Sequence, residues 1–317
     1  MDRVPQDLVV TILSKLDARS LCTAATTCTV FRDAADRVTN LRVHMTPGNR
    51  TALLQWLQKP SNASRVTLLR TARYPPFLDI SWLTQLHNLK SLVSAFSRIP
   101  SSIFSALSPT HLVNLHIHRL NPAPPTDVFS TRILEKFIHL RRVHISFAPG
   151  WAVGIIGPGL ESLHHLETFE IRRIPALAIT RSIPATSHVA LHAFDVISSS
   201  YVPVAPYATS LSLECDDAPI DTLDEMLSST TQLTSLTLSS TGMLRIPLLE
   251  TMSHLQNLHI WTTLYYFPDL EQLPSLKNLV LDVDSSLVFD QHSSLPTSIQ
   301  SVKVTAQGSQ IDVYEYL

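Results

Sequence analysis

The sequence predicts an α/β protein in which a three-helix module at the N-terminus precedes a solenoid of about 12 repeated units. Two features carry this prediction. A six-residue apolar pattern recurs along most of the 317 residues, whereas residues 1–40 have apolar residues at helical spacing. Hydrophobic residues make up 44% of the chain, enough to bury a sizeable core. We expect a parallel sheet on the concave face of the solenoid, joined by mixed helical and irregular return segments.

The repeated pattern is an apolar residue, two residues of any kind, a second apolar residue, one further residue and a third apolar residue. Its clearest copies begin at Leu112, Leu140, Leu166, Leu191, Leu233, Leu255, Leu276 and Ile299. Weaker copies begin at Val38, Ala63, Leu89 and Ala208. The mean interval between these starts is about 24 residues. Because side chains alternate along a strand, the second and third apolar residues face the same way, and stacked units bury them together.

This pattern resembles the leucine-rich repeat, whose period is about 20–29 residues. The resemblance covers the chain from residue 38 onward and implies a strand and a return segment in each unit. Three returns have the spacing or acidic start of a short helix, over 52–58, 131–140 and 221–233. The repeat family often places Asn three residues after the last apolar position. Here that position holds residues such as Leu120, Ala148 and Ile174, so the asparagine ladder is absent.

The N-terminal segment predicts three helices. Pro5 suits a helix start, where its missing N–H costs nothing. One apolar stripe of the first helix would consist of Leu8, Val9, Ile12, Leu13 and Leu16. Asp17 can cap a second helix, which would bury Leu21, Ala24, Ala25 and Cys28. The third helix would carry Phe31, Ala34, Ala35 and Val38.

The order and spacing of these residues resemble the F-box, a module of about forty residues. The matching positions are Val4-Pro5, Asp7, Leu8, Ile12-Leu13, Leu16, Asp17, Leu21, Cys28 and Phe31. Val4, Thr27 and Phe31 stand where leucine, valine and tryptophan are usual in that family. The resemblance divides the chain into an F-box-like helical domain at 1–40 and a leucine-rich-repeat solenoid at 41–317. A second interpretation stays open, in which the helices only cap the solenoid with a polar surface.

An F-box followed by leucine-rich repeats is the architecture of substrate receptors in ubiquitin ligases. The resemblance implies that the F-box docks on a Skp-type adaptor, and through it on a cullin with its RING partner, while the repeats hold the target protein. Such a subunit performs no chemistry and needs no cofactor, since it acts through proximity. The residues implied for adaptor binding are Val4, Pro5, Leu8, Ile12, Leu13, Leu16, Leu21 and Phe31. Several of them must instead hold the module together.

Two other functions stay open. The repeats could form an interaction scaffold with no role in ubiquitin transfer. They could also hold a small molecule, as in some plant F-box repeat proteins. That function would need a dense Lys/Arg pocket, for which Arg142 and Arg172 are thin support.

The residues beside the inward apolar positions line the concave face of the predicted sheet. Parallel strands lie about 4.8 Å apart, so the middle positions of successive units predict one row of neighbours: His116, His144, Glu170 and Asp195. We expect the target protein to bind this region together with Trp261, because aromatic residues are enriched at binding hot spots. The predicted substrate-binding residues are His116, His118, Arg142, His144, Glu170, Arg172, Asp195, His259 and Trp261. A solvated face without a ligand is the alternative.

Composition argues against several other classes of protein. The net charge of −2 predicts no general affinity for nucleic acid or anionic membranes. Three cysteines cannot form a disulfide framework, and no apolar segment has the length of a signal or a membrane span. We therefore expect an intracellular protein, cytoplasmic or nuclear. The 14 histidines form no recognisable zinc pattern, and the four glycines within 150–159 lack the spacing of a phosphate-binding loop. We expect a long loop there, and no metal or catalytic residue.

Overall fold

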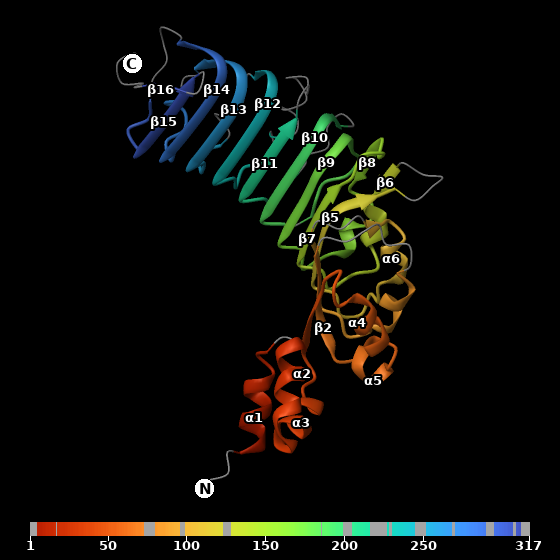
Figure 1. The fold of residues 1–317 in the computed structure, drawn as a ribbon. Coiled ribbons are helices and arrows are strands. Elements are labelled where there is room, and N and C mark those ends of the chain that lie inside the picture. Colours follow the sequence, from red (N-terminus) through yellow and green to blue (C-terminus); the bar gives the residue numbers. More distant parts are fainter. Residues whose placement is uncertain are drawn as a thin grey trace. The chain divides into compact units, whose positions relative to one another are not determined.

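A computed structural model describes residues 5–16, 18–72, 80–95, 99–122, 128–184, 186–198, 205–215, 227, 230–244, 252–267, 270–289, 295–306 and 309–311. Within these ranges, three N-terminal helices precede a parallel sheet of twelve strands, as in a leucine-rich-repeat solenoid (Figure 1). The predicted fold class is therefore confirmed. The chain forms two compact units, residues 1–123 with 136–145 and residues 124–135 with 146–317.

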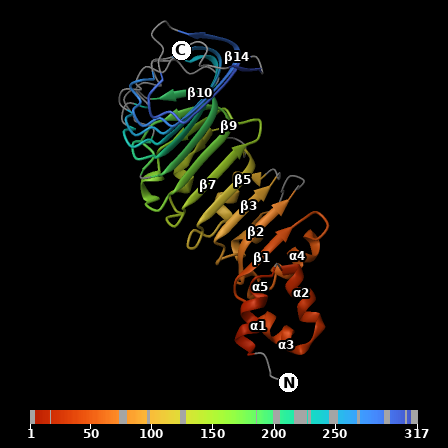
Figure 2. The same ribbon diagram turned by 90° about the vertical axis from the view of Figure 1, so that its left-hand side faces the viewer.

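The first unit contains the three helices and the first strands of the sheet. The helices are α1 (Gln6–Leu13), α2 (Ala18–Thr27) and α3 (Thr29–Asp36). The strands lie side by side in the order β1 (Leu41–Met45), β2 (Val66–Ala72), β3 (Ser91–Ala95), β5 (Asn114–Asn121) and residues 142–145 of β7 (Arg142–Phe147) (Figure 2). The returns carry α4 (Arg50–Leu57), α5 (Pro60–Ala63), η1 (Ser81–Gln85), β4 (Ile99–Pro100) and α6 (Ile103–Ala106). The helix expected over 52–58 is confirmed as α4.

The second unit contains the remaining strands. The long strands follow one another in sequence order: β9 (Thr168–Ile179), β10 (His188–Ser198), β11 (Ser210–Cys215), β12 (Ser235–Leu244), β13 (Asn257–Phe267), β14 (Asn278–Phe289) and β15 (Ser301–Ala306). Each is parallel to the next, and β16 (Ser309–Ile311) runs antiparallel to β15. Shorter elements precede them: β6 (Val128–Ser130), η2 (Thr131–Leu134), β8 (Val153–Ile156) and η3 (Leu160–Ser162).

Two other expected return helices have different outcomes. The prediction of a helix over 131–140 is wrong, because only the short 3-10 turn η2 forms there. Leu134, Phe137 and Leu140 are all fully buried, and their three-residue spacing suits a tight, irregular return. Most of the helix expected over 221–233 lies outside the described residues.

Burial along the described strands follows the predicted alternation, except in two units whose predicted register is wrong. In β1, Leu41, Val43 and Met45 are buried and the residues between them are exposed. In β2 a bulge at Thr67 makes Leu69, rather than Leu68, the buried third apolar residue of its unit.

The second misplaced register falls in β10. The structure pairs Val189 with Phe169 and Leu191 with Ile171, so this unit begins at Thr186, five residues before the predicted start at Leu191. The buried Thr186 occupies the first position of the unit, where the pattern has an apolar residue. Because Thr186 is polar, the start of this unit could not be recognised from the apolar pattern.

The missing asparagine ladder is replaced by apolar packing. Leu120, Ala148 and Ile174 occupy the Asn position of their units and are buried. Arg119 and Arg173, which precede two of these residues, have φ angles of 68° and 62°. This left-handed conformation is uncommon outside glycine.

The three N-terminal helices share one apolar core with the first strand. Its buried members are Val9, Leu13, Leu21, Ala34, Ala35, Val38 and Leu41, and Trp56 of α4 packs against them. The core therefore continues past residue 40 into the first repeat. Cys28 is exposed, so its expected burial in the second helix is wrong. It has an extended backbone and forms the break between α2 and α3.

Candidate functional site

Large apolar side chains are exposed on the three-helix module. Leu8 and Ile12 on α1 are 51% and 55% exposed, and Val30 and Phe31 on α3 are 51% and 37% exposed. We call these four residues and the exposed Pro5 the apolar patch. Clustered exposed apolar residues of this size mark interaction surfaces in soluble proteins.

An open hollow connects most of the apolar patch. Its lining residues are Pro5, Gln6, Val9, Ile12, Leu13, Val30, Phe31 and Asp33. Leu8 lies one helical turn before Ile12, on the same side of α1. A hollow with apolar walls and an apolar rim can receive side chains from a partner protein.

The structure divides the residues predicted to bind an adaptor into two groups. Pro5, Leu8, Ile12 and Phe31 are exposed and belong to the apolar patch. The other described members lie in or against the core: Leu13, Leu16 and Leu21. These three residues stabilise the patch from within, and Val4 lies outside the described residues.

Sequence reasoning missed Val30. Its only signal was an apolar residue directly before Phe31 near the start of a short helix. Apolar residues at helical spacing indicate the buried face of a helix. Val30 was missed because it lies on the exposed side of α3.

The open face of the first unit is the side of its sheet that carries the residues between the buried apolar positions. Strand registers place His44, Arg70, Val93 and His116 in one row across β1, β2, β3 and β5. The rings of His116 and His144 stack with 4.2 Å between their centroids. The predicted neighbourhood of these two histidines is therefore confirmed. Arg142 is exposed on β7, and His118 is half-buried on β5.

The open face of the second unit has carboxylates paired with cations. Glu170 lies 3.4 Å from Arg172 and 3.5 Å from His188 on the neighbouring strand. The prediction that Asp195 lies in the row of Glu170 is wrong. The residue beside Glu170 is Ala190, and Asp195 lies farther along β10 beside Ala176, because the unit begins at Thr186.

The predicted pair His259 and Trp261 lies on β13. His259 Nε2 is 3.1 Å from Asp282 Oδ2 on the neighbouring strand. Trp261 is half-buried and lies in register with Asp282. The side chains of Tyr265 and Tyr266, considered as its aromatic neighbours, lie outside the described residues.

Comparison with known families decides what the N-terminal module is. Its sequence matches the model of a family described as F-box-like, over residues 1–42. Residues 1–42 are an F-box-like domain. An LRR-like parallel sheet follows it.

Three solved structures are reported among those similar to the chain. An internalin (inlF) from Listeria monocytogenes is 13% identical, with 81% of this chain and 97% of that chain covered and a TM-score of 0.31. The functional domain of InlJ from Listeria monocytogenes is 15% identical, with 87% of this chain and 55% of that chain covered and a TM-score of 0.46. The mouse RP105/MD-1 complex is 12% identical, with 84% of this chain and 47% of that chain covered and a TM-score of 0.41. No curated protein matches the sequence. None of these three TM-scores reaches 0.5, so the fold rests on the strand registers described above.

Arg65 joins the F-box-like domain to the first repeat. Its Nε donates to the carbonyl oxygen of Val38 at 2.7 Å, and its Nη2 donates to that of Ala35. The Ala35 carbonyl lies in the last turn of α3, where a cation is favoured, and the Val38 carbonyl lies two residues beyond the helix. The guanidinium therefore fixes the last turn of α3 against the segment that enters β2.

Replacing Arg65 with Met should destabilise the protein by about 2 kcal/mol, since hydrogen bonds to charged groups each contribute about 1.5–3 kcal/mol. Urea unfolding checks this value. The Arg32→Met variant is the control, because Arg32 is exposed on α3. An equal loss in the two variants would show that Arg65 is no more than a surface cation.

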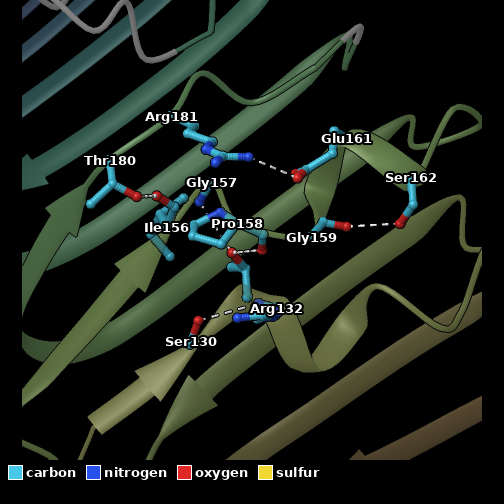
Figure 3. Close-up of polar contacts among 11 residues, drawn as sticks. Ser130, Arg132, Ile156, Gly157, Pro158, Gly159, Glu161, Ser162, Thr180 and Arg181 are labelled. Carbon is cyan, nitrogen blue, oxygen red and sulfur yellow. Dashed lines mark hydrogen bonds and ion pairs between the residues drawn. The ribbon is translucent and has the colours of Figure 1, made fainter.

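The glycine-rich segment 150–159 is a strand and a braced turn rather than the expected long loop. Gly154 lies in β8, which pairs with β6 and β9. The buried hydroxyl of Thr131 accepts a hydrogen bond from the Gly157 N–H at 3.1 Å and donates to the Pro158 carbonyl at 2.8 Å. Nearby, Arg181 donates to Glu161 at 3.0 Å (Figure 3). The Thr131 hydrogen bonds fix the turn at Gly157 and Pro158 to η2, so this segment has a structural role.

Two kinds of site or segment are absent among the described residues. Within those ranges, no three His, Cys, Asp or Glu side chains are grouped so that they could hold a metal ion. None of the described helices is long and apolar enough to cross a membrane.

Proposed function

We propose that this chain is the substrate-recognition subunit of an SCF-type ubiquitin ligase. The observation that supports it is the exposed apolar patch on a domain that matches the F-box-like family. F-box domains in general bind a Skp-type adaptor. The adaptor would cover Leu8, Ile12 and Phe31 and would link the chain to a cullin.

In this proposal the F-box-like domain and the repeats bind different partners. The domain at 1–40 holds the adaptor, and the repeats at 41–317 hold the target protein. F-box and leucine-rich repeat domains are typically non-catalytic, so the contribution of the chain is to raise the local concentration of the target. In this proposal the chain acts inside the cell, in the cytoplasm or the nucleus.

The proposed contact residues lie on the open faces of the two units. On the first unit they are His116, His118, Arg142 and His144; on the second they are Glu170, Arg172, His259 and Trp261. Trp261 is the expected hot spot of the second set, because a half-buried aromatic can add apolar contact without unfolding.

Reconstitution with purified Skp-type adaptor and cullin–RING complex tests this function. The chain should elute with the cullin only when the adaptor is present, because the adaptor bridges them. Co-elution without the adaptor, or no co-elution with it, would contradict the proposal. The second result would favour a repeat scaffold without a role in ubiquitin transfer.

A further inference from the structure

The net charge of −2 conceals two regions of opposite charge. Residues 37–126 contain ten Lys or Arg and one Asp or Glu. Residues 127–317 contain ten Lys or Arg and twenty Asp or Glu. An excess of this size within one region attracts ligands of the opposite charge, whatever the total for the chain.

The positive region supplies four of the five strands on the open face of the first unit, β1, β2, β3 and β5, and residues 142–145 of β7 complete that face. These five strand segments include no Asp, Glu or Lys. The charged and titratable residues of these strands are Arg42, His44, Arg70, His116, His118, Arg119, Arg142 and His144. Arg42, Arg70 and Arg142 are exposed. The guanidinium groups keep their charge at all physiological pH values, and the imidazoles add charge when protonated.

On the open face of the second unit, by contrast, carboxylates lie beside histidines of the neighbouring strands. His188 lies 3.5 Å from Glu170, His192 lies 3.2 Å from Glu214, and His259 lies 3.1 Å from Asp282. Each pair joins neighbouring strands. The described strands of the first unit carry no Asp or Glu, so Arg42 and Arg70 have no equivalent carboxylate within those strands.

We propose that the open face of the first unit binds a carboxylate-rich segment of a partner protein. The inference rests on the proposed function, in which that partner is the target for ubiquitin transfer. Arginine binds carboxylates through paired hydrogen bonds, which favour Asp and Glu side chains over amides. Five strands about 4.8 Å apart span roughly 19 Å, the length of about six extended residues lying across them.

Two other occupants fit the face less well. Single-stranded nucleic acid is held largely by bases that stack on aromatic side chains, and these strands carry no Phe, Tyr or Trp. Of their histidines, His116 and His144 already stack on each other. A second copy of the chain would have to use the carboxylates of its residues 127–317. Those on the open face of its second unit, Glu170, Glu214 and Asp282, already lie beside histidines of their own chain, and a second copy would have to replace these contacts.

Fluorescence anisotropy with short labelled peptides tests the proposal on the full chain, with co-expressed adaptor when the two associate. The probe is a 12-residue peptide in which Glu and Asp alternate with Ser and Gly. Its twin has Gln and Asn in place of the acids. We expect the acidic probe to bind at least tenfold more tightly than its twin, and the Arg42→Gln/Arg70→Gln variant to lose at least tenfold. The matched variant Lys59→Gln/Arg132→Gln removes two exposed cations elsewhere and should change affinity less than twofold.

Equal affinity for the two peptides, or equal losses in the two variants, would overturn the proposal. Tighter binding of a 12-nucleotide single-stranded DNA than of the acidic peptide would assign the face to nucleic acid instead. An anisotropy change that appears only when light scattering shows self-association of the chain would assign the open face to a second copy.

Measuring adaptor binding in the same samples separates the proposed ligase role from the proposed acidic ligand. Lost adaptor binding with retained peptide affinity contradicts the ligase role alone, and the reverse contradicts only the acidic ligand.

Discussion

The Leu8→Glu/Ile12→Glu variant should bind a Skp-type adaptor at least a hundredfold more weakly than the wild type, with its fold unchanged. Both side chains are more than half exposed on α1 and belong to the apolar patch. Hot-spot residues each cost about 2 kcal/mol or more when they are lost, and a hundredfold change in Kd is about 2.7 kcal/mol. Isothermal titration of the adaptor into each protein gives the ratio directly.

A matched control separates the apolar patch from a general effect of added charge. Ile138 and Tyr207 are 51% and 60% exposed and lie outside the F-box-like domain. The Ile138→Glu/Tyr207→Glu variant adds the same two charges and should bind the adaptor within about threefold of the wild type, since surface changes outside the contact have small effects. Equal weakening in both variants, or none in either, would show that the apolar patch is not the contact surface.

Replacing Gly157 with Ala should destabilise the second unit by on the order of 3 kcal/mol, through backbone strain and overpacking. Gly157 has a φ of +119°, which side chains rarely allow. A Cβ atom there would lie 2.6 Å from both the backbone N and the Cβ of Arg181. The chain cannot move away easily, because the Thr131 hydroxyl holds the Gly157 N–H. Equilibrium denaturation measures the loss.

The control for this substitution is Gly48→Ala. A Cβ atom at Gly48 would meet no heavy atom within 4 Å. We expect its free energy of unfolding to change by less than about 1 kcal/mol, within the range of surface substitutions. If both alanine variants lose the same stability, the braced turn is not the reason why Gly157 is needed.

The repeat architecture was predictable because the signal is redundant. Twelve copies at similar spacing outweigh a wrong assignment in any one of them. The two misplaced registers had local causes that apolar spacing does not record. Thr67 forms a bulge in β2, and the polar Thr186 occupies an apolar position while Leu191, Phe194 and Val196 imitate a complete unit.

The candidate site was predictable only in part. The spacing of the N-terminal residues gave the module, but not which side of each helix faces solvent. For this reason Leu13 and Leu21 were expected at the adaptor contact although they are buried, and the exposed Val30 was missed. Arg65 was invisible because its contacts with Ala35 and Val38 are about 30 residues away along the chain. The positive charge on the open face of the first unit was missed, because the net charge of the chain sums two regions of opposite charge.

Association of the wild-type chain with a Skp-type adaptor is the most direct test of the account. The two proteins would be co-expressed and separated by size-exclusion chromatography with light scattering. We expect a stable one-to-one complex, larger than the 35.3 kDa of the chain by the mass of one adaptor. A soluble monomer of the chain that ignores the adaptor would contradict it. The N-terminal helices would then be a cap for the repeats, and the chain an interaction scaffold without a role in ubiquitin transfer.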